Sequence, residues 1–208
     1  ELHLTIADVG PFSHAANQLK KGDQAGLRGP YGTSFSWKPK QRIVMVGGGF
    51  GSAPLYFTAY HAVKDGCKVD FIIGARKKDL LIYTDRIKKL KNCELHIATN
   101  DGSAGHKGFN VEILRKLLLK NTYDMIMTCG PEMMMKAVAE LAEQYETDAQ
   151  ISLERYMKCG FGLCGQCVVD PIGETTCTKG TVVSLSYLKK VTEFGKYHRD
   201  ALGKKHAF

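Results

Sequence analysis

The sequence predicts an α/β protein in which a β-rich stretch comes first, a parallel-sheet domain follows, and a small cysteine loop ends the chain. Three observations carry this prediction: turn signals throughout residues 1–35, alternating apolar runs and amphipathic segments from Ile43 onward, and four closely spaced cysteines near the C-terminus. A chain of 208 residues can bury two modest cores. We therefore expect domains at residues 1–38, 39–150 and 151–208.

The first part is expected to contain strands. Residues 2–7 alternate polar and apolar side chains, and turn signals follow at Gly10-Pro11, Gly22-Asp23 and Gly29–Gly32. Two or three strands are too few to close a barrel, so the stretch is predicted to be the end of a β-rich unit. The polar, proline-containing stretch 37–42 is the expected boundary.

The second part shows the strand–helix alternation that builds a parallel sheet. Strands are expected at residues 42–46, 68–74, 94–98 and 125–129, with helices at 53–64, 84–90, 110–119 and 132–145. After residue 184 the basic tail is expected to be irregular apart from one short helix.

Composition excludes several classes of protein. With 44% hydrophobic and 24% charged residues the chain is typical of a globular protein, and it lacks the 18 or so consecutive apolar residues of a membrane span. No signal peptide is visible. The net charge of +8 is spread along the chain without a nucleic-acid recognition module, so nucleic acid is not an expected partner. Three scattered cysteines outside the cluster argue against a disulfide framework and favour a reducing cytoplasm.

The C-terminal cysteines carry the most specific signal. They follow the order C-x4-C-x2-C-x9-C, the plant-type spacing for a 2Fe–2S cluster, and are Cys159, Cys164, Cys167 and Cys177. Intervening glycines let the backbone turn inward and direct amides at the sulfurs. The alternative is structural zinc, which usually takes two matched C-x2-C pairs. The spacing therefore favours one-electron chemistry.

Two loops are candidates for nucleotide binding. The first joins a buried strand to a helix through Gly47, Gly48, Gly49 and Gly51, where helix amides can bind a pyrophosphate. It lacks the G-x-G-x-x-G form, so a merely tight turn is the alternative. The second loop, residues 129–132, also follows a strand. Because both loops lie at carboxyl ends of parallel strands, we expect them to face one another across a dinucleotide.

These motifs resemble those of a known superfamily. Residues 46–55, 129–134 and 29–35 resemble the ferredoxin–NADP reductase superfamily, and residues 152–167 with Cys177 are similar to the electron-transfer (K) subunits of two-subunit dihydroorotate dehydrogenase. The resemblance covers essentially the whole chain. It implies a truncated flavin-binding barrel at 1–38, an NAD-binding domain at 39–150 and a 2Fe–2S domain with the tail at 151–208.

The resemblance also implies a function. A member of this family is a cytoplasmic oxidoreductase subunit of pyrimidine biosynthesis, forming a heterotetramer with an FMN-containing catalytic subunit. Electrons pass from that FMN through a 2Fe–2S cluster and FAD to NAD⁺. Alternatives are the NAD(P)H-oxidising small subunit of a bifurcating transhydrogenase, sulfide dehydrogenase or soluble hydrogenase, and, from another class, a zinc-bound nucleotide-binding module without a redox role.

Site residues follow from the same resemblance. The four cysteines would ligate the cluster, and Cys129 would lie near the hydride path. The NAD(H) site would be lined by Gly48, Gly49, Gly51, Gly130, Pro131 and Glu132. The flavin would be held by Thr5, Ile6, Ala7, Phe12 and Ser13, whose alternative is ordinary strand and turn packing. Glu154 and Arg155, before the cysteine loop, could tune the potential of the cluster or contact a partner, but a solvated pair is the stronger expectation because exposed ion pairs are common.

Overall fold

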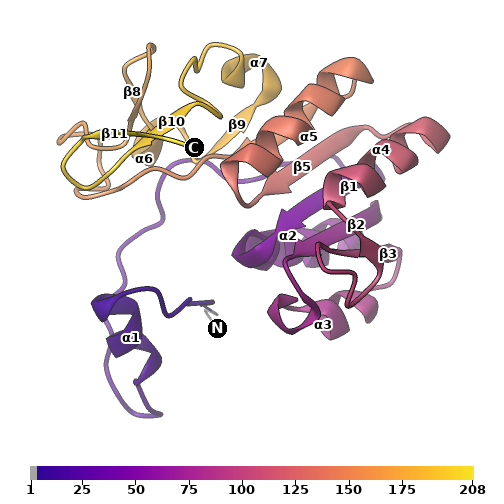
Figure 1. The fold of residues 1–208 in the computed structure, drawn as a ribbon, viewed down its shortest axis with the longest axis horizontal. Helices are drawn as coiled ribbons and strands as arrows, with labels where there is room; N and C mark the ends of the chain where they lie inside the picture. The colour runs from indigo at the N-terminus through magenta and orange to yellow at the C-terminus, as the bar shows by residue number, and fades with distance from the viewer. Residues whose placement is uncertain (1–3) are drawn as a thin grey trace. The chain divides into compact units, whose positions relative to one another are not determined.

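The computed structural model describes residues 4–208, and packing divides the chain into two compact units. The first unit ends at Pro30 and the second runs from Tyr31 to Phe208, so the break lies closer to the N-terminus than the expected boundary at residue 38. Among the described residues of the first unit, the one regular element is the helix α1, Pro11–Asn17 (Figure 1).

Local sequence explains why α1 forms where turns were expected. Pro11 occupies the first helical position, which suits its fixed φ and missing N–H. The Ser13 hydroxyl accepts hydrogen bonds from the amides of Val9 and Gly10, each at 2.9 Å. The strand prediction for residues 4–7 is wrong, and residues 2 and 3 lie outside the described part. An extended segment is stable only beside a partner strand, and none pairs with it among residues 4–30.

The second unit is built on a seven-stranded sheet of order β4-β3-β2-β1-β5-β6-β9. All strands run parallel except β9, which is antiparallel to β6. The strands of this sheet are β1 Arg42–Gly48, β2 Lys68–Ala75, β3 Cys93–Thr99, β4 His106–Lys107, β5 Met125–Cys129, β6 Ala149–Ser152 and β9 Val182–Ser184.

Helices cover both faces of the sheet (Figure 1). The longer helices are α2 Ser52–Lys64, α4 Asn110–Lys120 and α5 Glu132–Gln144; the shorter ones are α3 Thr84–Lys88 and the 3-10 turns η1 Gly49–Gly51 and η2 Lys78–Leu80. The four predicted strands and four predicted helices of this region are confirmed, with ends within two residues of those expected. Their strong periodicity explains this agreement.

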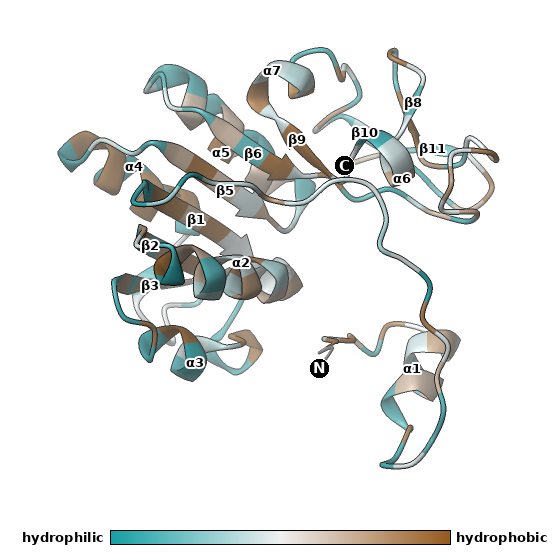
Figure 2. Cartoon of the chain, turned by 180° about the vertical axis from the view of Figure 1, so that it is seen from behind, coloured by the Kyte–Doolittle hydropathy of each residue, from teal (hydrophilic) through white to brown (hydrophobic). Residues whose placement is uncertain are grey.

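Alternation along β1 separates two apolar cores. Ile43 and Met45 pack with α2 and α3, whereas Val44 and Val46 pack with α4 and α5 on the other face. All four side chains are fully buried. The central strands are accordingly brown in Figure 2, while the covering helices carry teal on their exposed surfaces. A sheet buried on both faces requires this near-continuous apolar character.

The C-terminal segment extends the same sheet. The expected boundary at residue 150 falls within β6, and β9 pairs with β6 after the chain has passed through the cysteine loop. The remaining elements are β7 Val168–Val169, β8 Glu174–Thr175, α6 Thr176–Lys179, α7 Leu185–Leu188, β10 Tyr197–Arg199 and β11 Lys205–Ala207. The short helix expected in the tail is α7, but the tail also forms a β10–β11 hairpin.

The hairpin is held by one carboxylate. Asp170 accepts hydrogen bonds from the Tyr197 hydroxyl at 2.7 Å and from Arg199 at 2.5 Å. These contacts join positions far apart in sequence, which local periodicity does not reveal.

No helix in the described range 4–208 is both long enough and apolar enough to cross a membrane.

Candidate nucleotide and cluster sites

The first candidate site lies where the strand order reverses. From β1 the chain winds outward to β2, β3 and β4, and then returns to the other side of β1 as β5. Residues Gly47–Gly51 begin in the last two residues of β1 and continue beyond it, and Cys129–Pro131 begin at the last residue of its neighbour β5. In open α/β sheets ligands bind in the crevice outside the carboxyl ends of such strands.

The two loops are in direct contact. A Cβ atom placed on Gly51 would lie 2.1 Å from the carbonyl oxygen of Cys129, and one on Gly130, whose φ is +151°, would lie 2.9 Å from Gly48. Neither position has room for a side chain. Gly51 of the first loop and Gly130 of the second are therefore required by the close approach of the two loops.

The start of α2 offers a site for an anionic group. The Ser52 hydroxyl is fully buried at the first turn of this 13-residue helix and has no hydrogen-bond partner among the described residues. Above Gly49, space is open, since a Cβ there would contact nothing within 4 Å. Helix N-terminal amides and an unpartnered hydroxyl suit the pyrophosphate of a dinucleotide.

Residues of the second loop differ in whether their side chains are free to contact a ligand. Cys129 is partly exposed, and burial raises the pKa of its thiol, so it is protonated at neutral pH. Pro131 precedes α5 and packs against Gly48, where a Cβ would lie 2.7 Å from its ring. Glu132 is different, because both its carboxylate oxygens are engaged within the chain, with Arg155 and with the amide of Gly195.

The four cysteines form the second candidate site. The loop brings the cysteines together in two pairs, since the amide of Cys164 lies 3.5 Å from Cys159 Sγ and the amide of Cys177 lies 3.5 Å from Cys167 Sγ. Backbone amides point at the sulfurs: Gly162 N lies 3.2 Å from Cys177 Sγ, and Cys164 N lies 3.5 Å from Cys159 Sγ. Amides of Cys164 and Phe161 lower the pKa of Cys159 to about 6, which favours a thiolate.

The arrangement of the sulfurs distinguishes two metals. Four thiolates around one zinc, with Zn–S bonds of about 2.3 Å, would all lie about 3.8 Å apart. In the described chain the one set of three or more potential ligand atoms mutually within 4.8 Å is Asp70, Glu94 and His96, so no three cysteine sulfurs come that close. Two pairs of cysteines instead suit two irons, each held by one pair.

The predicted flavin residues do not come together as a binding site within the first unit. Thr5, Ile6 and Phe12 are exposed, and the Ser13 hydroxyl is occupied in capping α1. Their role in holding a flavin stays a prediction.

Arg155 is buried, contrary to the expectation of a solvated pair with Glu154. Its Nη1 lies 2.7 Å from a Glu132 carboxylate oxygen, and its Nε lies 2.7 Å from one of Glu193. The sequence offered no signal for this network, because the three residues are distant from one another in the chain. The expectation failed because it treated a charged residue as exposed by default.

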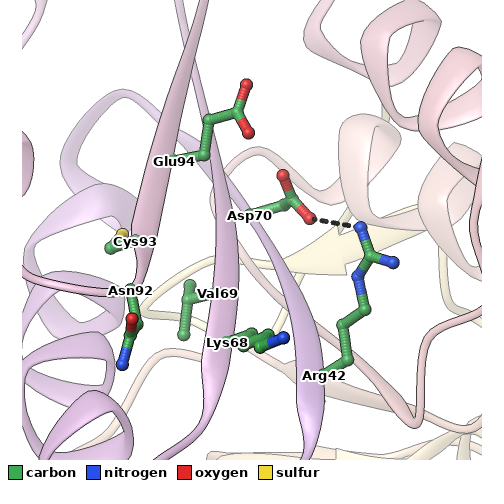
Figure 3. Close-up of a pocket in the computed structure, with 7 residues that line it drawn as sticks. All are labelled: Arg42, Lys68, Val69, Asp70, Asn92, Cys93 and Glu94. Atoms are coloured by element: carbon green, nitrogen blue, oxygen red, sulfur yellow. Dashed lines mark ion pairs between the residues drawn. The ribbon is translucent and has the colours of Figure 1, made fainter.

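A hollow of about 570 Å³ lies at the opposite edge of the sheet, at the amino ends of β1, β2 and β3. Figure 3 shows the Arg42 guanidinium reaching across it to the Asp70 carboxylate, with Glu94 nearby. Asp70 also accepts hydrogen bonds from Tyr123 at 2.8 Å and His96 at 2.9 Å. None of the predicted site residues lines this hollow.

Comparisons with known proteins match the two regions of the chain that contain these candidate sites. Residues 45–140 match the oxidoreductase NAD-binding domain, and residues 154–188 match the iron–sulfur cluster binding domain of dihydroorotate dehydrogenase B. A Methanocaldococcus jannaschii protein named as a probable dihydroorotate dehydrogenase B (NAD(+)) electron transfer subunit is 46% identical, over 97% of this chain and 77% of its own length. A Methanothermobacter thermautotrophicus protein of the same name is 42% identical over 99% of this chain and 76% of its own length.

Solved structures show the same fold. A structure described as an NADH-dependent reduced ferredoxin-NADP oxidoreductase, which performs flavin-based electron bifurcation, is 30% identical with a TM-score of 0.76, covering 91% of this chain and 71% of its own. The cytochrome b5 reductase domain of Ulva prolifera nitrate reductase, at 19% identity and a TM-score of 0.55 over 66% of this chain and 60% of its own, shares the fold alone. The sequence identity and coverage place this chain in the family of dihydroorotate dehydrogenase B electron transfer subunits, an oxidoreductase family.

Proposed function

We propose that this chain carries electrons from the FMN of a catalytic dihydroorotate dehydrogenase subunit to NAD⁺ in pyrimidine biosynthesis. Its cofactors are a 2Fe–2S cluster, FAD and NAD(H), and the two kinds of subunit form a heterotetramer in the cytoplasm. The observation that carries the proposal is the pairing of Cys159 with Cys164 and of Cys167 with Cys177, in a segment that matches the iron–sulfur domain of this enzyme and follows a two-loop nucleotide site.

The cysteine loop would hold the cluster. Cys159 and Cys164 would bind one iron, and Cys167 and Cys177 the other. Amides such as that of Gly162 would stabilise the added negative charge on reduction, because hydrogen bonds to the sulfurs raise the reduction potential.

The glycine loops would hold the dinucleotide. Gly48, Gly49 and Gly51 would face its phosphates with Gly130 and Pro131, and Cys129 would lie near the hydride path. Glu132 would act on this site by fixing the loop, since its carboxylate is already bound. When bound, the flavin links two successive one-electron transfers to the transfer of one hydride. Thr5, Ile6, Ala7, Phe12 and Ser13 are proposed to hold it.

The surface around the cysteine loop suits a partner subunit. Phe161 and Leu163 are 64% and 79% exposed, and they precede the exposed residue Cys164 in the same loop. Apolar side chains exposed beside a redox ligand are typical of a surface that another protein covers. Docking there would shorten the electron-transfer distance to the FMN of the catalytic subunit.

The proposal is tested with the complex of both subunits, purified without oxygen. Adding dihydroorotate and NAD⁺ should produce NADH. Cys164→Ser should abolish NADH formation while the partner still reduces an artificial dye, and Cys93→Ser, a partly buried cysteine outside the loop, should retain it. Full-rate NADH formation by Cys164→Ser, or zinc without acid-labile sulfide in the wild-type protein, would contradict the proposal.

A second candidate is the small subunit of a bifurcating transhydrogenase. It is favoured by the TM-score of 0.76 to the bifurcating oxidoreductase structure. The same preparation separates the two: reduction of the complex by NADPH and not by dihydroorotate would support the second candidate.

A further inference from the structure

A buried ion network joins three segments that are distant in sequence. Glu132 begins α5 directly after the second nucleotide loop, Arg155 precedes Cys159 by four residues, and Glu193 belongs to the C-terminal segment. The side chains are 7%, 3% and 1% exposed respectively. Two carboxylates thus share one guanidinium in a region almost without solvent.

The geometry of the network depends on arginine. Nε of Arg155 donates to Glu193 and Nη1 donates to Glu132, each at 2.7 Å. Nη1 also donates to the carbonyl of Glu154. The planar guanidinium holds these donors at fixed angles, which a lysine ammonium cannot do. Burial lowers the pKa of Arg155, but the charges of Glu132 and Glu193 outweigh it, so the pKa stands above its usual range.

Each carboxylate also holds a backbone amide. The second oxygen of Glu132 accepts from Gly195 N at 2.7 Å, and that of Glu193 accepts from Asp170 N at 3.2 Å. Asp170 follows Cys167 by three residues. The network therefore contacts the cysteine loop at two points, at Arg155 before Cys159 and at Asp170 after Cys167.

Burying three charges has a cost that apolar side chains would avoid. Replacement of a buried ion network by well-packed apolar residues is often neutral or stabilising, whereas removal of one partner is strongly destabilising. Stability alone therefore does not account for this arrangement. Its distinguishing property is that none of the three segments can move without leaving a buried charge unpaired.

We propose that Arg155 is a positioning residue that couples the second nucleotide loop to the cysteine loop, so that a dinucleotide bound at Gly130 also restrains the backbone around Cys159 and Cys167. The inference rests on the proposed function, because it requires a dinucleotide at that loop. Glu132 follows Gly130 by two residues, so a change in the loop is passed directly to the guanidinium.

Hydrogen–deuterium exchange of the oxygen-free complex, with and without NAD⁺, tests the coupling. In the wild type, NAD⁺ should slow exchange in peptides covering residues 47–52 and 129–134, and also in those covering 154–167 and 168–171. Arg155→Lys keeps the positive charge but loses the planar guanidinium, whose donors point at fixed angles to both carboxylates. In this variant the slowing at the nucleotide loops should persist, and the slowing around the cysteines should be lost.

Controls separate this inference from the function on which it rests. Lys189→Met removes an exposed ion pair with Glu143, 3.7 Å apart, and should respond as the wild type does. Absence of any slowing at residues 47–52 and 129–134 in the wild type would refute the nucleotide site itself. Slowing there without slowing around the cysteines would overturn only the coupling.

A variant without charges in the network is needed in case the lysine of Arg155→Lys still contacts both Glu132 and Glu193, or in case that variant does not form the complex. Glu132→Gln, Arg155→Met and Glu193→Gln together leave no buried charge unpaired, so the fold is expected to persist. The electron paramagnetic resonance signal of the reduced cluster gives a second readout: NADH, which occupies the same site without oxidising the cluster, should shift this signal in the wild type and not in the triple variant. An unchanged cysteine-loop response in the triple variant would overturn the inference.

Discussion

Two arginine–carboxylate networks lie at opposite edges of one sheet, and they differ in burial. At the carboxyl edge the Arg155 side chain is 3% exposed and lies 2.7 Å from each of two carboxylates. At the amino edge Arg42 is 41% exposed and lies 3.6 Å from Asp70. The first network joins loops assigned to binding, whereas the second joins neighbouring strands of the scaffold. The strength and the role of such a network therefore depend on its burial and on what it connects.

The largest effect is expected from Arg155→Met. Without the guanidinium, Glu132 and Glu193 remain buried and unpaired, and the free energy of unfolding should fall by about 3–5 kcal/mol. Denaturant unfolding of the holo-protein without oxygen, followed by the single tryptophan Trp37, measures this. A loss below about 1 kcal/mol, the size typical of exposed pairs, would remove the distinction between the two networks.

A smaller effect is expected from Asp70→Asn. The amide still accepts a hydrogen bond but carries no charge for His96 and Arg42, so a loss of about 1–3 kcal/mol follows from weakened buried bonds. Glu94→Gln is the matched control, because that side chain is 76% exposed. Equal losses for the two variants in the same unfolding experiment would show that Asp70 is not the centre of the network.

The pH dependence of stability should identify Asp70. Burial raises the pKa of this carboxyl, but hydrogen bonds from His96 and Tyr123 outweigh it, so the pKa lies below its usual 3.8. A group with a lowered folded-state pKa stabilises the fold fully above its unfolded pKa and less as pH falls through the folded value. The stability difference between wild type and Asp70→Asn should be constant above about pH 5 and shrink below pH 3.8. A difference that grew on acidification would contradict this reasoning.

The smallest effect is expected from Lys189→Met. The pair with Glu143 is 3.7 Å long and both side chains are about half exposed, so its loss should change the unfolding free energy by about 0–1 kcal/mol. Raising the salt concentration should reduce even that difference. A change as large as that of Arg155→Met would mean that burial is not what separates the networks.

Sequence patterns predicted most of the α/β region because its information is local. Strands β1, β2, β3 and β5 and their helices follow from periodicity within a dozen residues, and the expectation that both nucleotide loops lie at carboxyl ends of parallel strands follows from the same pattern. The first unit was predicted less well. Alternation in residues 4–7 is a weak signal, since a strand also needs a neighbour, and Gly10-Pro11 begins a helix rather than a turn.

The sequence by itself determined the cysteine spacing, the glycine loops and the parallel strands, because each depends on residues close together in the chain. Only the tertiary structure decided how the cysteines pair, that β9 joins the sheet, and that Arg155 lies between Glu132 and Glu193. The position of Arg155 depends on partners 23 and 38 residues away in the chain, and on burial that removes water from all three charges. Local propensity and spacing contain no record of such distant partners.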